Sequence, residues 1–468
     1  MILTPNLIRS VLKAEVISKY DVRIDISKSR FSIDSRTIEK GEIFIAIKGE
    51  RCDAHTFIES AYLNGASAII TRKHLECPEL AIPIIKVDDP VAAMQKLATM
   101  LIREYQPIVI GITGSNGKTT SKEFTAALLR NYGETHCNAG NLNSLIGLPL
   151  SVLNTDFPCK FLVLEMGMLH HGDIDLLNRI ALPKVTIITN IGSAHIKFLG
   201  SQEAIALEKA KIFQNGCPVV LNPNAPYSDL LIERAKESNS TILSFGEGKD
   251  CDIKLLDYSN SRVSIEIYGA RYTYQFPNYG LHFVYDSLAA IGVAKALELD
   301  ITNELLENTF STFQPSKGRG EHHNFSIDGK KITVIDDTYN ANYESISALI
   351  KYVQSTYSDM RVITIIGSIG DMGERAEEFY RKLAERVGSL ESLILIGTDK
   401  ISILKESLAN SVALYADVDE LINNFYRDHP LTQDTVIAIK GSRFMNLEKF
   451  VQHIIAKADQ LLPLESIS

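Results

Sequence analysis

The sequence predicts an α/β protein of three domains, and two observations carry this prediction. Its 468 residues correspond to about three domains at roughly 150 residues each. Short apolar runs typical of buried strands alternate with helical patterns, as parallel sheets with crossover helices require. We place the predicted domains at residues 1–106, 107–314 and 315–468.

The first predicted domain is a small α/β unit. Residues 41–47, GEIFIAI, have the apolar, β-branched composition of a strand. Residues 55–70, HTFIESAYLNGASAII, indicate a helix that leads into a second strand. The unit is predicted to end just before Pro107, which opens the next one.

The central domain is predicted to hold a parallel sheet like that of P-loop ATPases. Its first strand is IVIGIT, at residues 108–113. Further apolar runs at 161–166, 185–191 and 218–222 are separated by helical patterns. This alternation favours parallel strands joined by crossover helices.

The third domain is predicted to be Rossmann-like. The segment QPSKGRGEHH at 314–323 combines Pro, Gly and charge, and we interpret it as a linker or interdomain loop. Strand-like runs then resume at 332–336, 361–367, 393–397 and 435–441. Open parallel sheets bind ligands beyond the C-terminal ends of their strands, so we expect an active site between the second and third domains.

Composition excludes several function classes. The net charge is -9, which argues against general binding of nucleic acids or membrane surfaces. The N-terminus lacks a signal-peptide pattern, and no apolar run approaches a membrane span of about 20 residues. The six cysteines form no C-x-x-C spacing, so we interpret them as reduced thiols. We expect a cytoplasmic protein and a monomer.

The most specific motif is GITGSNGKTT at 111–120, which follows an apolar strand and precedes a helical pattern. This is the context of a phosphate-binding loop, where backbone N–H groups and the helix N-terminus favour an anion. Position 112 is Ile where the strict motif has Gly; the alternative interpretation is a structural turn with a solvated lysine. The predicted nucleotide-binding residues here are Gly114, Ser115, Asn116, Gly117, Lys118, Thr119 and Thr120.

Two further candidates follow predicted strands. Glu165 ends one strand and His195 lies just past another, where acidic and imidazole groups near a phosphate loop can hold divalent ions. Mg²⁺ prefers oxygen ligands, so a surface glutamate and a hydrogen-bonded loop histidine are equally good interpretations from spacing alone.

Lys209 is predicted to lie on the inward face of a helix. It shares that face with Ile205 and Ile212, whereas Glu208 and Lys211 point elsewhere. Such a lysine either extends its ammonium group to water or has a function, and the first is the commoner case. The adjacent pair His170 and His171 is interpreted as a solvated loop.

Taken together, these motifs resemble the Mur ligase family along the whole chain. The resemblance rests on IDSRTIEKGEIFIAIKGERCDAH at 33–55, GSNGKTT at 114–120, NLNSLIGLPLS at 141–151, LEMG at 164–167, TNIGSAH at 189–195, GRGE at 318–321, IDDTYNAN at 335–342, GDMGE at 370–374 and KGSR at 440–443. The IDDTYNAN stretch is similar to the member that adds D-alanyl-D-alanine, and the D-N-P-R signature of the diaminopimelate-adding member is absent.

The resemblance implies an ATP-dependent amide ligase of peptidoglycan synthesis. The carboxylate of UDP-N-acetylmuramoyl-tripeptide would attack the γ-phosphate of ATP, and the amine of D-alanyl-D-alanine would attack the resulting acyl phosphate. Both steps concentrate negative charge, which cations must stabilise.

The resemblance also assigns roles to residues of the central domain. Lys118 would stabilise the γ-phosphate, and Thr119 with Glu165 would hold one Mg²⁺. His195 would help to hold a second Mg²⁺. Lys209 matches the lysine that the family carbamylates, which would make it an oxygen ligand for the metal.

Other roles fall on the outer parts of the chain. Arg319 and Asp337 would reach the phosphates and ribose of ATP when the third domain closes about a hinge near residues 313–320. The remaining predicted contacts are Ser35 and Arg36 with the uracil and ribose of the UDP group, Asn143 with the muropeptide, His282 near adenine, and Asn340 and Asn342 near the dipeptide or nucleotide.

Four positions depart from the family pattern, namely Ala54, Ser144, Phe283 and Asp286. The last two affect the expected adenine contacts. Three alternatives therefore stay open: another amide ligase of the superfamily, such as a different muropeptide ligase or a folate polyglutamate ligase; a nucleotide-dependent binding or switch protein; and an inactive relative.

Overall fold

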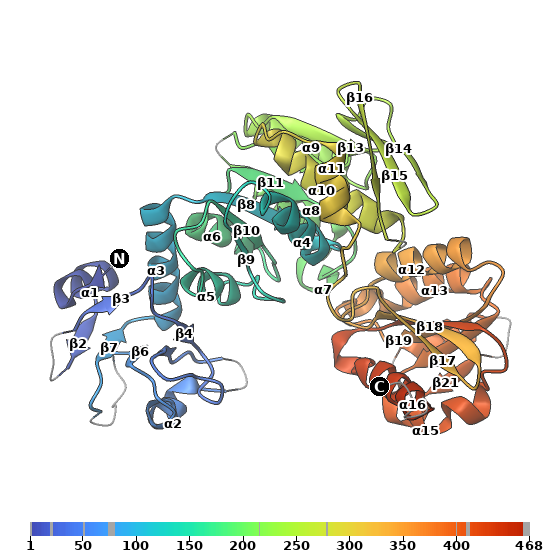
Figure 1. Ribbon diagram of the computed structural model, residues 1–468. Helices are drawn as coiled ribbons and strands as arrows, with labels where there is room; N and C mark the ends of the chain where they lie inside the picture. Colours follow the sequence, from blue (N-terminus) through green and yellow to red (C-terminus); the bar gives the residue numbers. More distant parts are fainter. Residues whose placement is uncertain are drawn as a thin grey trace, which may run out of the picture.

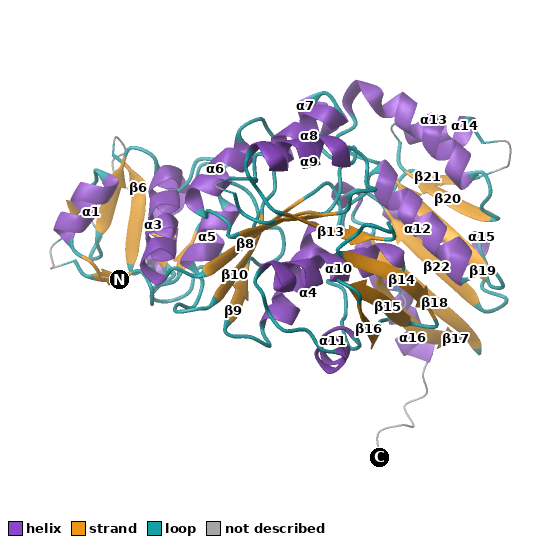
Figure 2. Ribbon diagram, turned by 90° about the horizontal axis from the view of Figure 1, so that it is seen from above, coloured by secondary structure: helices purple, strands orange, loops and turns teal. Residues whose placement is uncertain are grey.

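The computed structural model contains three main sheets that follow one another along the chain (Figure 1). It describes residues 2–18, 22–49, 52–73, 80–214, 216–277, 279–398, 400–408 and 412–461. The central sheet lies between the first and third units in both views (Figure 2). The predicted α/β class with three sheet-containing units is confirmed, and the strands of each sheet fall within one predicted domain. The limits at 106/107 and 314/315 stay a prediction.

The first unit has a five-stranded sheet in the order β2-β7-β6-β5-β4, in which only β2 is antiparallel to its neighbour. A separate antiparallel pair joins β1 to β3. The strands are β1 (Ile2–Leu3), β2 (Glu15–Ile17), β3 (Ile24–Asp25), β4 (Phe31–Ser32), β5 (Ile43–Ile45), β6 (Ala68–Arg72) and β7 (Ile84–Val87), and the helices are α1 (Pro5–Leu12), η1 (Ala54–Phe57), α2 (Ile58–Leu63) and α3 (Pro90–Tyr105).

Helix α3 connects the first unit to the central sheet. Asp89 caps its start by accepting a hydrogen bond from the backbone N–H of Val91, and Pro90 occupies the first turn, where a missing N–H costs nothing. The helix ends at Gln106, whose φ is 49°, and Pro107 follows. Proline cannot continue a helix, so the chain passes directly into the next strand.

The central unit has nine strands in the order β16-β15-β14-β13-β12-β11-β8-β10-β9. From β9 to β14 the pairs are parallel, as predicted for the apolar runs. The strands are β8 (Ile108–Thr113), β9 (Thr135–Cys137), β10 (Phe161–Glu165), β11 (Val185–Ile188), β12 (Val219–Leu221), β13 (Ile242–Gly246), β14 (Ile253–Ser259), β15 (Arg262–Ile267) and β16 (Ala270–Gln275). The helices are α4 (Lys118–Leu129), α5 (Gly147–Leu153), α6 (Asp173–Ile180), α7 (Ile196–Leu199), α8 (Gln202–Ala210), α9 (Ser228–Glu237), α10 (Leu281–Ala296) and α11 (Asn303–Phe310).

The antiparallel extension β14-β15-β16 was not predicted from the sequence. Its strands alternate buried and exposed residues, unlike the continuous apolar runs of the parallel strands. A sheet with one face toward water has this pattern. The alternation in β15, RVSIEI, was the signal that could have revealed it.

The third unit has six strands in the order β17-β18-β22-β19-β20-β21, and only β17 is antiparallel. Helices α12 and α13 cover one face, and α15 and α16 cover the other (Figure 1). The strands are β17 (Glu321–Ile327), β18 (Lys330–Asp337), β19 (Arg361–Gly367), β20 (Ser392–Ile396), β21 (Ala413–Tyr415) and β22 (Thr435–Lys440), and the helices are α12 (Tyr343–Thr356), η2 (Gly373–Arg375), α13 (Ala376–Val387), α14 (Ile401–Glu406), α15 (Val418–Asp428), η3 (Arg443–Met445) and α16 (Glu448–Leu461).

The interpretation of residues 314–323 as a linker or interdomain loop was wrong for the last three residues. The segment 314–323 is not a loop throughout, because Glu321, His322 and His323 begin strand β17. This is an edge strand, whose exposed side can carry polar and charged side chains, so its composition resembled that of a linker.

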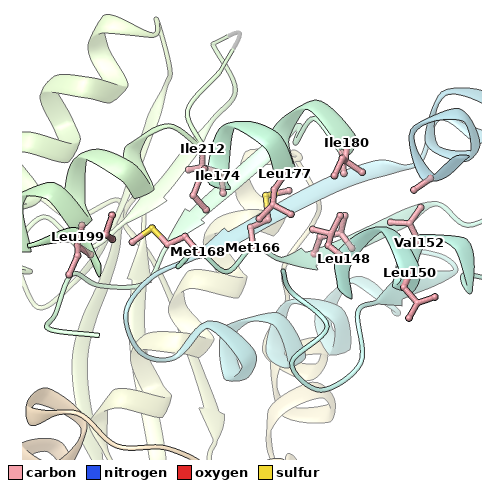
Figure 3. Close-up of a cluster of buried hydrophobic side chains, with 14 of the residues drawn as sticks. Leu148, Leu150, Val152, Met166, Met168, Ile174, Leu177, Ile180, Leu199 and Ile212 are labelled. Atoms are coloured by element: carbon pink, nitrogen blue, oxygen red, sulfur yellow. The ribbon is translucent and has the colours of Figure 1, made fainter. Parts of the chain in front are cut away.

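The central sheet rests on a packed layer of apolar side chains. Figure 3 shows Leu148 and Val152 of α5, Leu177 of α6, and Met166 and Met168 just after β10, all of them buried. Met166 directly follows Glu165, the last residue of β10, so the layer reaches the loop after that strand. Close packing there fixes the loops that follow β10 and β11.

Two predictions about composition can be compared with the described residues. Within them, Cys52, Cys137, Cys159, Cys217 and Cys251 are free thiols, and Cys77 lies outside the described residues. No helix in the described part of the chain is long and apolar enough to cross a membrane.

Candidate active site

A cavity of about 1430 Å³ lies between the C-terminal ends of the central and third sheets. Most of the predicted site residues line it. They are Ser115, Asn116, Gly117, Lys118, Thr119, Thr120, Asn143, Glu165, His195, Lys209, His282, Arg319, Asp337, Asn340 and Asn342.

The loop between β8 and α4 contains two glycines in backbone conformations that other residues rarely adopt. Gly114 has φ 154° and Gly117 has φ 77°. A Cβ atom on Gly114 would lie 1.8 Å from the hydroxyl of Thr189, and one on Gly117 would lie 2.7 Å from a carboxylate oxygen of Asp286. Both positions therefore require glycine. The N-terminus of α4 faces the cavity, where its free N–H groups favour an anion.

Two lysines share one backbone oxygen at this loop. The Nζ of Lys118 donates to the carbonyl of Gly114 at 2.9 Å, and the Nζ of Lys209 donates to the same oxygen at 2.8 Å. Lys209 is 1% exposed, so the interpretation that it extends to water is wrong. Burial lowers the pKa of Lys209 well below its usual range, and the charge of Lys118 lowers it further.

Glu165 is the neighbouring carboxylate. It is 2% exposed, which contradicts the interpretation as a surface glutamate. The hydroxyl of Thr119 donates to its Oε2 at 2.7 Å, and the amide of Asn143 donates to its Oε1 at 2.6 Å. The hydroxyl of Thr119 and the carboxylate of Glu165 thus lie side by side, and oxygen atoms of this kind are the ligands that Mg²⁺ prefers.

His195 caps the start of α7 with φ 65°. Its Nδ1 is buried and has no hydrogen-bond partner among the described residues; the Oδ2 of Asp371 in the third unit lies 3.7 Å away. This contradicts the interpretation of His195 as a hydrogen-bonded loop histidine. Burial, assisted by Lys118 and Lys209, lowers the pKa of His195 to about 4. The ring is neutral at pH 7, as metal ligation requires.

The third unit contributes cations and a carboxylate to the same cavity. The guanidinium carbon of Arg319 lies 3.9 Å from the ring centre of Tyr339. Asp337 forms a 2.5 Å ion pair with Lys440, which is 3% exposed. Burial raises the pKa of Asp337, and the charge of Lys440 opposes this. Lys440 belongs to the KGSR motif, but no role was predicted for it from the sequence.

Asn340 and Asn342 differ in their surroundings. Asn340 is exposed to the cavity, and its side-chain oxygen accepts from the N–H of Ala341 at 2.9 Å. Asn342 caps α12 through its Oδ1, and its Nδ2 donates to the side chain of Asn116 in the phosphate loop at 2.7 Å. Asn342 therefore joins the third unit to the central one.

Asp286, a departure from the family pattern, packs against the phosphate loop. It is 8% exposed and accepts a hydrogen bond from the hydroxyl of Ser121 at 2.6 Å. Burial raises the pKa of Asp286 to about 8, and the bond from Ser121 opposes this. The carboxyl group is therefore largely protonated at neutral pH. Sequence reasoning named the position but not this contact.

Ser35 and Arg36 lie in the first unit and do not line the cavity. Ser35 is buried, and its carbonyl accepts from the side chain of Asn64 at 2.8 Å. Arg36 is 85% exposed and forms a 2.6 Å ion pair with Asp34. This pair holds the pKa of Asp34 at about 2, mainly through the hydrogen bond from the guanidinium.

Comparison with known proteins follows the same three-part division. Residues 29–100 match the Mur ligase family, catalytic domain; residues 112–294 match the Mur ligase middle domain; residues 318–443 match the Mur ligase, glutamate ligase domain. The chain is 31% identical over 439 residues to the UDP-N-acetylmuramoyl-tripeptide--D-alanyl-D-alanine ligase of Bacillus subtilis, covering 90% of this chain and 92% of that protein.

Solved structures agree along the full length. A crystal structure of MurF from Acinetobacter baumannii superposes with TM-score 0.84 at 25% identity, covering 98% of this chain and 99% of that one. MurF ligase from Thermotoga maritima in complex with ADP superposes with TM-score 0.81 at 27% identity, covering 94% of this chain and all of that one.

Proposed function

This chain belongs to the Mur ligase family, and on that premise we propose the reaction it catalyses. It is an ATP-dependent ligase that joins D-alanyl-D-alanine to UDP-N-acetylmuramoyl-tripeptide through an acyl phosphate. The product is UDP-N-acetylmuramoyl-pentapeptide for peptidoglycan synthesis. The relatives that support this substrate choice carry the same name in several bacteria, and they match most of the chain.

One observation carries the proposal. Lys118, Lys209 and Glu165 of the central unit and Arg319 and Asp337 of the third unit line a single cavity. A nucleotide-binding protein needs the phosphate loop and its lysine, but it does not need an additional, buried lysine beside that loop. A ligase does, because two successive steps each concentrate negative charge at the transferred phosphate.

The residues at the loop fit Mg²⁺. Thr119 and Glu165 would hold one ion, and His195 would help to hold a second beside them. The metal supplies charge stabilisation for the phosphate oxygens. The fit rests on the adjacent hydroxyl and carboxylate oxygens and on the buried Nδ1 of His195, which has no hydrogen-bond partner in the described part of the chain.

Lys209 carries a carbamate in the active enzyme. Two ammonium groups on one carbonyl oxygen repel each other, and burial already favours the neutral amine of Lys209. The neutral amine is the form that reacts with CO₂. The carbamate retains one N–H for the Gly114 carbonyl, and it presents anionic oxygens to a cation.

The chain's own groups position the reactants in both steps. Lys118 and the N-terminus of α4 hold the phosphates while a carboxylate oxygen of the muropeptide bonds to the γ-phosphorus and ADP leaves. Arg319 and Asp337 hold the nucleotide from the third unit. The amine of the dipeptide then bonds to the acyl carbon, and phosphate leaves.

The decisive experiment is a product assay. The protein is incubated with ATP, Mg²⁺, UDP-N-acetylmuramoyl-tripeptide and D-alanyl-D-alanine, and the mixture is analysed by mass spectrometry. We expect the pentapeptide mass and one phosphate per product. Parallel reactions with glutamate, a diamino acid, or folate plus glutamate separate the other ligases of the superfamily. ATP hydrolysis without any amide product would contradict the proposal.

The cellular setting follows from these substrates. We place the enzyme in the cytoplasm, where ATP and UDP-linked precursors are available, and we expect it to act as a monomer without nucleic acid or membrane partners. Size-exclusion chromatography with light scattering tests the monomer, whose expected mass is 51.9 kDa.

A further inference from the structure

Glu344 links the third unit to the loop between β11 and α7 of the central unit, which contains His195. It lies in the first turn of α12. Its Oε1 accepts from the backbone N–H of Ser193 at 2.9 Å and from the amide of Gln202 at 3.1 Å, and its Oε2 accepts from the hydroxyl of Ser193 at 2.8 Å. All three of these hydrogen bonds cross from one unit to the other.

The loop that Glu344 holds also contacts the phosphate loop. Gly192 donates its N–H to the hydroxyl of Ser115 at 2.8 Å. On its other side Gly192 lies so close to Glu344 that an added Cβ would be 2.9 Å from the carboxylate carbon. The segment is therefore enclosed between the third unit and the phosphate loop.

Both ends of this contact lead to residues of the proposed mechanism. Ser193 precedes His195 by two positions, and Gln202 is the first residue of α8, the helix that carries Lys209. A shift of the loop or of the start of α8 would move these groups relative to the nucleotide. Misplacement of about 1 Å in an active site costs on the order of 100-fold in rate.

Helix capping does not account for Glu344. An acidic residue in the first turn stabilises a helix through its dipole. However, α12 already begins with a complete capping box formed by Asn342 and Ser345. The carboxylate of Glu344 is turned toward the other unit, and its three donors are uncharged.

We infer that Glu344 is a positioning residue for ligation: its contact with Ser193 and Gln202 couples closure of the third unit to the placement of His195 and Lys209. The reaction named in this inference rests on the proposed function, whereas the contacts of Glu344 do not depend on it. Glu344 contributes no group to the phosphate loop itself, so its loss should reduce turnover more than nucleotide affinity.

Steady-state kinetics of the full-length enzyme test the inference with Glu344→Ala, Glu344→Gln and a matched control. The control is Asp419→Ala, which removes an acidic residue from the same helical position of α15, on a surface without a contact to the central unit among the described residues. We expect kcat to fall about tenfold or more in Glu344→Ala, with KM for ATP changed less than about threefold. Glu344→Gln keeps an acceptor for Ser193 and should lie between this variant and the parent.

The control should stay within about twofold of the parent, because its effect is confined to one exposed helix end. A Glu344→Ala variant with parental kcat overturns the inference. So does a loss of kcat that Asp419→Ala reproduces, or one accompanied by an equal loss of ATP affinity.

Small-angle scattering separates this inference from the proposed function. The parent and Glu344→Ala are compared with Mg²⁺ and a non-hydrolysable ATP analogue. We expect the parent to be more compact than the variant. If the parent makes no pentapeptide, the proposed function fails, but the scattering comparison still decides whether Glu344 holds the units together. Equal compaction of both proteins overturns the inference.

Discussion

Lys118 and Lys209 at the phosphate loop differ from Arg36 of the first unit in how their positive charges are compensated. Lys118 and Lys209 share one carbonyl oxygen, and neither has a carboxylate within ion-pair distance among the described residues. Arg36, in contrast, is mostly exposed and already paired with Asp34. An exposed pair is satisfied by its neighbour and by water. Lys209 is buried and Lys118 is partly buried, and holding both ammonium groups without an ion-paired carboxylate is costly. The two lysines therefore indicate where a phosphate or a carbamate belongs.

The largest effect is expected at Lys118. In Lys118→Ala, ligation should fall roughly 100-fold or more, about 3 kcal/mol of transition-state stabilisation, because the charge facing the transferred phosphate is lost. The measurement is turnover in the pentapeptide assay, with circular dichroism to show that the fold is intact. Lys236→Ala, an exposed lysine of α9, is the control. Near-normal turnover in Lys118→Ala would remove the phosphate-loop assignment.

Lys209 should be the next most sensitive position. Lys209→Ala should bind ATP but ligate at least tenfold more slowly, by the same positioning argument. A small carboxylic acid added to this variant should restore part of the activity by supplying the missing oxygens. Lys209→Arg should stay inactive, because it retains the positive charge but cannot carry a carbamate. Parental activity of Lys209→Arg would show that the site needs only a positive charge at this position, which would contradict the carbamate.

Asp286 is a buried acid beside the same loop, and burial raises its pKa whereas it lowers the pKa of Lys209. Its pKa of about 8 means that the folded state keeps a proton that the unfolded state loses near its ordinary value of 3.8. As pH rises between these values the unfolded state binds fewer protons, so the free energy of unfolding falls. Asp286→Asn has no such proton. Its melting temperature relative to the parent should therefore rise by about 3 °C or more from about pH 5 to pH 8. A constant difference across that range would contradict the assignment.

The smallest effect is expected at Arg36. Arg36→Ala breaks an exposed ion pair, so its melting temperature should match that of the parent at pH 7. If Arg36 contacts the UDP group, KM for the muropeptide should rise severalfold while KM for ATP stays unchanged. Lys40→Ala, another basic residue on the surface of the first unit, is the control. A clear fall in melting temperature would mean that this pair stabilises the fold after all.

The parallel sheets were predictable because their strands are buried on both faces and are therefore continuously apolar. IVIGIT and TVIAIK are examples, now β8 and β22. Strands β14 to β17 are among those that escaped prediction, and they are partly exposed or lie at a sheet edge. Their composition is set by contact with water as much as by pairing, so it overlaps with that of loops.

The candidate site divides along a similar line. Local spacing predicted the phosphate loop, the position of Glu165 at a strand end and the inward face of Lys209, whereas the roles of Glu165 and Lys209 came from the family resemblance. Asp286 and Glu344 received no such role. Their partners are 165 and 151 residues away in the chain, so no local pattern indicates these contacts.

The sequence by itself determined the class of fold, the phosphate loop and the inward face of Lys209, since each depends on periodicity or on the conformational freedom of glycine. Only the tertiary structure decided that Lys118 and Lys209 share a single oxygen and that Glu344 holds the loop before His195 from another unit. It also decided that the Nδ1 of His195 has no hydrogen-bond partner among the described residues. The physical reason is that burial and electrostatic coupling arise from groups far apart in the chain, whose distances are fixed only when the sheets pack against one another.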